Sequence, residues 1–132
     1  MAEIRISGRP SLTTIQPGYE HQINGLVAGA DIAAGQFVYI RSSDGAVLPA
    51  IGAAADEAAQ AVGVVLQPAA PGDGVTIYHG VVVRWGANLV PGTRYYLSGT
   101  NAGELADEAS TGGTTPIAVA VDATRIFVKP AL

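Results

Sequence analysis

The chain contains an internal repeat, because the segment that begins at Asp31 recurs at Asn88. The first copy has the sequence DIAAGQFVYI and the second NLVPGTRYYL, so that in both a glycine precedes a run of aromatic and apolar residues. In both copies a glycine-containing turn follows, and then a further apolar segment, at 61–65 and at 117–121. An internal repeat of this kind constrains the architecture of the domain more strongly than any local motif does. Two copies are too few for a solenoid, so the repeat predicts a compact, pseudo-symmetric β domain.

Short runs rich in Val, Ile and Tyr alternate with turn-forming clusters from Ile23 onward, a spacing typical of β-strands joined by turns. Glycine tolerates the positive φ that tight turns require, so Asp44-Gly45 and Gly72-Asp73-Gly74 predict turns. Gly80, between two strand-like runs, predicts a bulge or sharp bend. The one helix-forming stretch, 53–60, allows two turns at most. We predict strands near 23–27, 36–41, 46–49, 61–66, 74–79, 80–85, 94–98, 116–121 and 124–129.

The fold class expected from these elements is all-β. We predict a compact β-barrel or sandwich-like domain at 23–132, built from two related three-stranded units at about 27–83 and 84–129. Residues 1–22 differ in composition from the rest of the chain, because isolated Ile and Leu residues are interspersed there with Gly and Pro. Pro10 and Pro17 disfavour a helix, so this segment is predicted to be an extended N-terminal arm. It is either a frayed terminus or an arm that becomes ordered on a partner subunit.

The composition favours a structural protein that is covered by neighbours. Charged residues make up 14% of the 132 residues, against roughly 25% in ordinary soluble domains. The net charge is −4 and the seven Lys and Arg residues are scattered, which argues against nucleic-acid binding. The absence of cysteine excludes disulfides and cysteine-ligated zinc. With no apolar run long enough to cross a membrane, we expect no membrane partner and synthesis in the cytoplasm.

The residues that usually carry catalysis form no recognisable arrangement in the sequence. The two histidines, His21 and His79, have no second ligand at a metal-binding spacing, and no serine stands in a nucleophile elbow. The carboxylate pairs Asp56-Glu57 and Asp107-Glu108 are sequence neighbours on predicted loops, where solvated surface explains them best. We therefore expect no enzyme activity, no cofactor and no metal site.

Four residues are candidates for an oligomer interface: His79, Arg84, Trp85 and Tyr95. Trp and Arg are over-represented among interface hot spots, although Trp85 is equally explained as a cap on the core. His79 alternates with Val75 and Ile77 along one strand, which predicts a packed or interface position. Tyr95 and its neighbour Tyr96 are predicted to point to opposite faces of their strand.

The stretch from Val27 to Val83 resembles the capsid decoration, or cement, proteins of tailed bacteriophages. The resemblance is carried by four segments that follow one another along the chain: DIxxGxxVYI at 31–40, AVGVV at 61–65, PGDGVTI at 71–77 and GVVV at 80–83. Phage tail-fibre and head-fibre modules share the Gly-x-x-Val-Tyr-Leu strand and the Ala-Val-Gly-Val strand. They leave receptor or glycan binding at the host surface as the alternative function.

The resemblance implies a protein that binds the outer surface of the expanded phage head as a homotrimer at three-fold or quasi-three-fold sites. The partners implied are the major capsid protein and further copies of the chain, and the location is the outer capsid surface of the virion. In that family the N-terminal segment helps to grip the capsid lattice. By resemblance, the capsid-binding residues of the arm are Ile4, Arg5, Ile6, Arg9 and Leu12.

Overall fold

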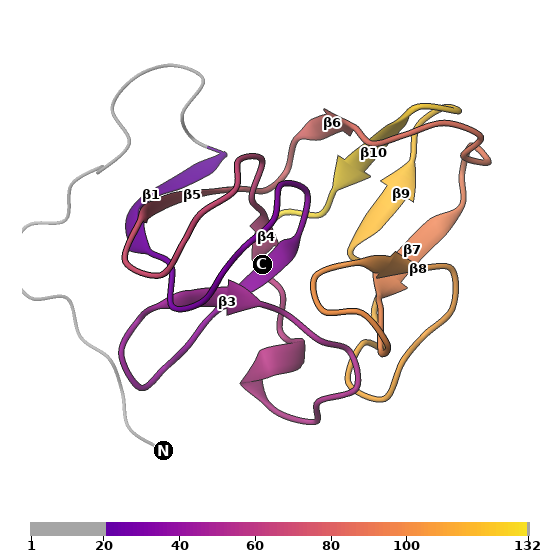
Figure 1. Cartoon of the computed structure of the whole chain (residues 1–132). Helices are drawn as coiled ribbons and strands as arrows, with labels where there is room; N and C mark the ends of the chain where they lie inside the picture. Colours follow the sequence, from indigo (N-terminus) through magenta and orange to yellow (C-terminus); the bar gives the residue numbers. More distant parts are fainter. Residues whose placement is uncertain (1–20, 132) are drawn as a thin grey trace, which may run out of the picture.

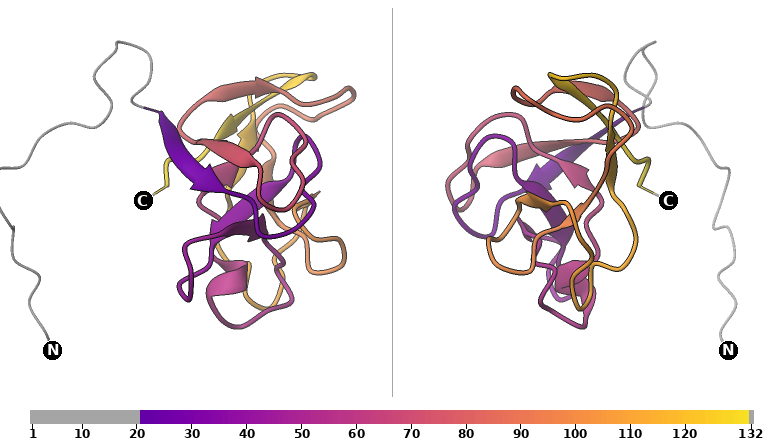
Figure 2. Two further views of the ribbon diagram at one scale, coloured as in Figure 1. Left: turned by 60° about the vertical axis from the view of Figure 1, so that its left-hand side comes forward. Right: turned by 90° about the vertical axis from the view of Figure 1, so that its right-hand side faces the viewer.

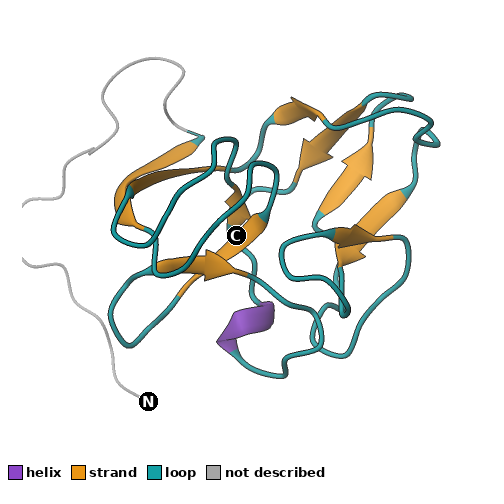
Figure 3. Cartoon of the chain, in the orientation of Figure 1, coloured by secondary structure: helices purple, strands orange, loops and turns teal. Residues whose placement is uncertain are grey.

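The structure is a computed structural model that describes residues 21–131, and it confirms the all-β class. The predicted arm at 1–22 lies almost entirely outside the described residues. Strands and loops make up nearly all of the described chain, and one 3-10 turn is the only helical element there (Figure 3). The elements are β1 (Gln22–Val27), β2 (Phe37–Ile40), β3 (Val47–Pro49), η1 (Glu57–Ala59), β4 (Gly63–Val64), β5 (Gly74–Tyr78), β6 (Val82–Arg84), β7 (Arg94–Leu97), β8 (Leu105–Ala106), β9 (Ala118–Ala120) and β10 (Arg125–Val128).

The strands form two five-stranded sheets with the same topology. The first has the order β1-β5-β4-β2-β3 and the second β6-β10-β9-β7-β8, and all neighbouring strands are antiparallel. Counting five strands onward from each member of the first sheet gives the second sheet in the same order. The sequence repeat therefore corresponds to a repeat of topology, with the first unit on the left of Figure 1 and the second on the right.

Each unit has five strands and not the three expected from the sequence. In each unit the first and last strands pair with one another and extend the sheet, as β1 does with β5 and β6 with β10. The strand β8 is absent from the predicted set because two residues are too short to show an alternating pattern. The predicted helix at 53–60 shrinks to the 3-10 turn η1, which the Asp56 carboxylate caps by accepting a hydrogen bond from Ala58 N.

The turn before the second strand is built alike in both units. Gly35 N donates to the Val65 carbonyl at 2.7 Å, and Gly92 N donates to the Ala120 carbonyl at 2.8 Å. Gly35 and Gly92 have φ of 87° and 84°, a conformation that costs a residue with a Cβ roughly 1–2 kcal/mol. The glycine that both copies of the repeat share is therefore required by the backbone.

The first sheet closes on itself around its own core. Ala28, just after β1, forms a parallel bridge with Val47 in β3, which joins the two edges of the sheet. The side chains that this closed sheet encloses are apolar and buried: Ala28, Ile32, Val38, Val47, Val65, Val75 and Ile77.

A second core fills the junction between the two units. Phe37 and Val64 project from the outer side of the first sheet and pack with Leu97, Ile126 and Val128 on the inner side of the second. Figure 2 shows from two further sides how the second sheet lies against the first. Fully burying a side chain of the size of Phe37 contributes about 1.5–3 kcal/mol, so this core ties the units together.

Backbone hydrogen bonds cross the same junction. Phe37 N donates to the Gly103 carbonyl at 2.8 Å, and Gly103 N donates to the Ala50 carbonyl at 2.6 Å. A second crossing joins Gly52 N to the Ser98 carbonyl at 2.8 Å. The two units are thus held by paired polar backbone as well as by apolar contact. No helix in the described part of the chain is long and apolar enough to span a membrane.

Candidate interaction face

The two sheets differ most on the side that faces away from the first unit's own core. In the first sheet a row of paired residues runs Gln22, Tyr78, Val64, Phe37. In the second sheet the corresponding row runs Val82, Phe127, Val119, Arg94. Tyr78, Val64 and Phe37 of the first row pack beneath the second unit, whereas the second row leaves Val82 and Phe127 exposed.

Exposure shows how differently the two rows are placed. Val64 is 0% and Phe37 1% exposed, but Val82 is 50% and Phe127 36% exposed. Alternation along β10 puts Ile126 and Val128 in the junction core and turns Phe127 outward. The second sheet therefore presents to solvent the positions that the first sheet buries against its neighbour.

Basic side chains surround this exposed apolar row. Four of the seven Lys and Arg residues of the whole chain lie there: Arg84 on β6, Arg94 on β7, Arg125 on β10, and Lys129 just after β10. We call the surface formed by the apolar row and these cations the outer face; its residues are Val82, Arg84, Arg94, Val119, Arg125, Phe127 and Lys129. Because the net charge of the chain is −4, four cations on one face concentrate positive charge on one side of an otherwise acidic molecule.

One of the four cations is already paired. The Asp122 carboxylate accepts hydrogen bonds from Thr124 N at 2.9 Å, from Arg125 N at 2.8 Å and from Arg125 Nε at 2.8 Å. These donors, the backbone N–H of Thr124 first and the Arg125 guanidinium second, lower the pKa of Asp122 to about 2. Arg84, Arg94 and Lys129 form no ion pair with any described residue and leave their charges available.

The outer face is hollowed at one end. A depression of about 320 Å³ is lined by Arg94, Thr115, Pro116, Ala118, Val119, Phe127 and Lys129. Its wall is apolar and its rim carries two cations. This is a shape and charge suited to an inserted apolar side chain flanked by carboxylates.

The sequence-derived candidate residues do not gather at one place. Arg84 lies on the outer face, but Trp85 turns the other way and packs on Phe37 with the ring centroids 5.8 Å apart. Tyr95 points into the junction core, while Tyr96 is not part of it, as predicted from their alternation. His79 lies just beyond β5, where its Nδ1 accepts a hydrogen bond from Ala131 N at 3.2 Å.

The five arm residues proposed as capsid contacts, Ile4, Arg5, Ile6, Arg9 and Leu12, lie outside the described residues. The sequence does not reveal the outer face as a unit, although period-two alternation places Arg125, Phe127 and Lys129 on one side of their strand. The signal that reveals it is the mismatch within the repeat: Phe37 in the first copy is replaced by Arg94 in the second. A cation at the position of a buried aromatic residue indicates that this side of the second sheet is not buried as the first is.

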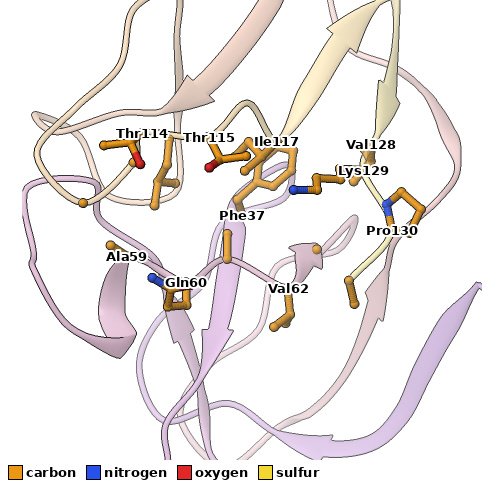
Figure 4. Close-up of a pocket in the computed structure, with 16 residues that line it drawn as sticks. Phe37, Ala59, Gln60, Val62, Thr114, Thr115, Ile117, Val128, Lys129 and Pro130 are labelled. Carbon is orange, nitrogen blue, oxygen red and sulfur yellow. The ribbon is translucent and has the colours of Figure 1, made fainter.

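Two further hollows lie at the junction. One, of about 430 Å³, is lined by residues of both units, among them Phe37, Gln60, Thr114, Thr115, Ile117 and Lys129, which Figure 4 labels. The other, of about 590 Å³, brings together Trp85, Arg84, Gln36 and Glu104. Within residues 21–131 no group of three or more His, Asp or Glu side chains stands close enough to hold a metal ion.

Comparison with known proteins identifies no family. No family model matches the chain, and neither does any curated protein sequence.

Proposed function

We propose that this chain is a structural virion protein that decorates the outer surface of a tailed-phage capsid as a homotrimer and stabilises the expanded head. The observation that carries the proposal is the outer face. It keeps an exposed apolar row at positions that the first sheet buries against a neighbouring unit, and it rings that row with cations. Exposed apolar patches with a polar rim are typical of protein interaction sites.

The low charge of the chain supports the same function, because a decorating subunit is covered on several sides by coat protein and by its own copies. Contacts repeated by symmetry add up, so a shell gains stability from many copies that each bind modestly. The major capsid protein is the partner in this proposal. The chain is made in the host cytoplasm and functions on the outside of the virion.

The test mixes the purified protein with expanded phage shells that lack decoration and images the mixture by electron microscopy. Added density at three-fold or quasi-three-fold sites, with one trimer per site, is the expected result. Bare shells after saturation with the protein would remove the proposal. A parallel measurement of shell disruption on heating is expected to shift to higher temperature in decorated shells.

The arm is tested separately by removing residues 1–20. This deletion stops short of Gln22, the first residue of β1, which pairs with Tyr78 of β5, so the first sheet keeps all its strands. We expect the truncated protein to keep its cooperative unfolding transition and to lose shell binding. Unchanged shell binding would assign capsid contact to the β domain alone.

A second candidate function, binding of a host-surface glycan, is favoured by the hollow around Trp85. Saccharide sites pair an aromatic ring with polar side chains, and Arg84 and Glu104 both line this hollow. Neither side chain forms a hydrogen bond with another described residue, so both are free to engage a ligand. Glycan-array binding that disappears in Trp85→Ala and persists in Trp85→Phe would support this alternative, and an empty array would dismiss it.

A further inference from the structure

We propose that the outer face of one copy binds the first unit of a second copy, so that the homotrimer assembles head to tail. This inference rests on the proposed function, in which the chain acts as a homotrimer, and adds which two surfaces meet.

The positive charge of the outer face disfavours a contact between the outer faces of two copies. A two-fold contact places the same patch of both copies together, which would bring Arg84, Arg94 and Lys129 against the same three side chains. Like charges placed opposite one another cost several kcal/mol at an interface. The occupant must therefore carry carboxylates and few cations.

The first unit of the chain meets that requirement. Within residues 21–80 there are five carboxylates and a single cation, Arg41, whereas residues 81–131 hold four of each sign. The acidic residues of the first unit are Asp31, Asp44, Asp56, Glu57 and Asp73. A second copy of this chain thus supplies a surface of opposite charge to the outer face.

Three of these carboxylates form one patch, which we call the acidic patch: Asp44, Asp56 and Glu57. The Glu57 carboxylate accepts hydrogen bonds from Ser42 N at 2.9 Å and from the Ser42 hydroxyl, which fixes η1 against the turn between β2 and β3. That hydroxyl first, and the Ser42 N–H second, lower the pKa of Glu57 below its ordinary value. Arg41 offsets only one charge, because its Nη2 lies 2.7 Å from Asp44 Oδ2.

The two surfaces lie on different sides of the molecule. In Figure 1 the second sheet occupies the right, and its outer face points away from the first unit. The turn between β2 and β3 lies at the lower left and η1 at the bottom of the same view. A contact between two different surfaces leaves one unused outer face and one unused acidic patch at the two ends of a row of copies. When these two surfaces meet, the row closes into a ring, and in a trimer the ring has three copies.

The test uses two variants of the full chain, each with one surface disabled. Variant A reverses the outer face with Arg84→Glu, Arg94→Glu and Lys129→Glu, three exposed positions. Variant B neutralises the acidic patch with Asp44→Asn, Asp56→Asn and Glu57→Gln. Asparagine at position 56 keeps an oxygen to accept from Ala58 N and remains a good N-cap. At positions 44 and 57 the amide keeps one acceptor oxygen of the two that each carboxylate uses.

Sedimentation velocity gives the masses without any capsid present. The wild-type chain is expected at three times the 13.3 kDa mass of one copy. Each variant alone is expected to be a monomer. An equimolar mixture is expected to give a 1:1 complex with twice the mass of one copy, because variant B keeps the outer face and variant A keeps the acidic patch. Circular dichroism and thermal unfolding of each variant verify that it is folded.

Three results would overturn the inference: a wild-type monomer at all concentrations, a trimer of variant B, or a mixture in which A and B stay separate. Decorated shells together with a monomeric wild type would leave the proposed function standing and remove only this inference. Undecorated shells together with the A and B complex would do the reverse.

Discussion

Phe37 and Arg94 occupy equivalent positions of the two sheets and of the sequence repeat, yet Phe37 is 1% exposed beneath the second unit and Arg94 stands exposed on the outer face. Their strands share length, register and neighbours, so the difference does not come from local structure. It comes from what covers each sheet. The first sheet is covered by the second, and the second presents the same side to solvent.

Truncation of Phe37 tests how much the junction core contributes to stability. Phe37→Ala removes a fully buried ring that contacts Trp85, and it is expected to lower the free energy of unfolding by about 3–5 kcal/mol. Phe127→Ala, on the outer face, is the matched control and is expected to change it by less than about 1 kcal/mol in the monomer. Urea denaturation at a concentration where the protein is monomeric measures both. Equal losses in the two variants would contradict the assignment of Phe37 to the core.

Alanine substitutions at Gly103 and Gly45 distinguish the energetic cost of backbone strain from the cost of steric crowding at the junction. Both stand in the turn that follows the second strand of their unit, with φ of 79° and 74°. A Cβ on Gly103 would lie 2.7 Å from Gln36 Cβ, whereas a Cβ on Gly45 meets nothing within 4 Å. Gly45→Ala is expected to cost about 1–2 kcal/mol of unfolding free energy, and Gly103→Ala clearly more.

Thermal or urea unfolding of both glycine variants gives the comparison. Equal destabilisation would mean that the turns of the two units are equally constrained, and that the contact between Gly103 and Gln36 adds nothing to the junction.

Acid sensitivity is expected to arise in part from Asp122. Its pKa of about 2 in the folded protein lies below the ordinary value of about 3.9, so its ionised form stabilises the fold. This contribution is complete above about pH 5 and is lost as the pH falls toward 2. Urea denaturation at several pH values is expected to show a smaller acid loss in Asp122→Asn than in the wild type.

The matched control is Asp107→Asn, because Asp107 lies in a loop and its side chain forms no hydrogen bond with another described residue. That variant should follow the wild-type pH profile. If the stability of Asp122→Asn also depended on pH as the wild type does, the hydrogen bonds from Thr124 and Arg125 would not couple the ionisation of Asp122 to folding.

Much of the fold could be predicted because the patterns that specify strands and turns are local. The alternation of Ile126, Phe127 and Val128, and the shared glycine before β2 and β7, depend only on neighbours in sequence. Which strands join to form each five-stranded sheet could not be predicted in this way. Pairing of β1 with β5 joins segments from opposite ends of the first unit, and local pattern does not specify such contacts.

The outer face could be predicted only in part for a similar reason. Arg84 is visible as a candidate because arginine is common at interfaces, but its neighbours on the outer face come from separate strands of the sheet. Trp85, beside it in sequence, points into the junction because adjacent strand residues face opposite ways. Which side of a sheet is covered depends on how the two units pack, and the sequence hints at this only through the change from Phe37 to Arg94.

Binding of the protein to undecorated expanded shells by two valine variants tests the central claim most directly. Val82→Asp places a charge in the apolar row of the outer face, and Val27→Asp places the same charge at a valine of nearly equal exposure, 47% against 50%, on the first unit. We predict that Val82→Asp raises the concentration needed for half-saturation of the shells about tenfold or more, while Val27→Asp stays within about twofold of the wild type. Equal binding by the two variants, with both folded, would contradict the claim that the outer face is the surface through which this protein assembles.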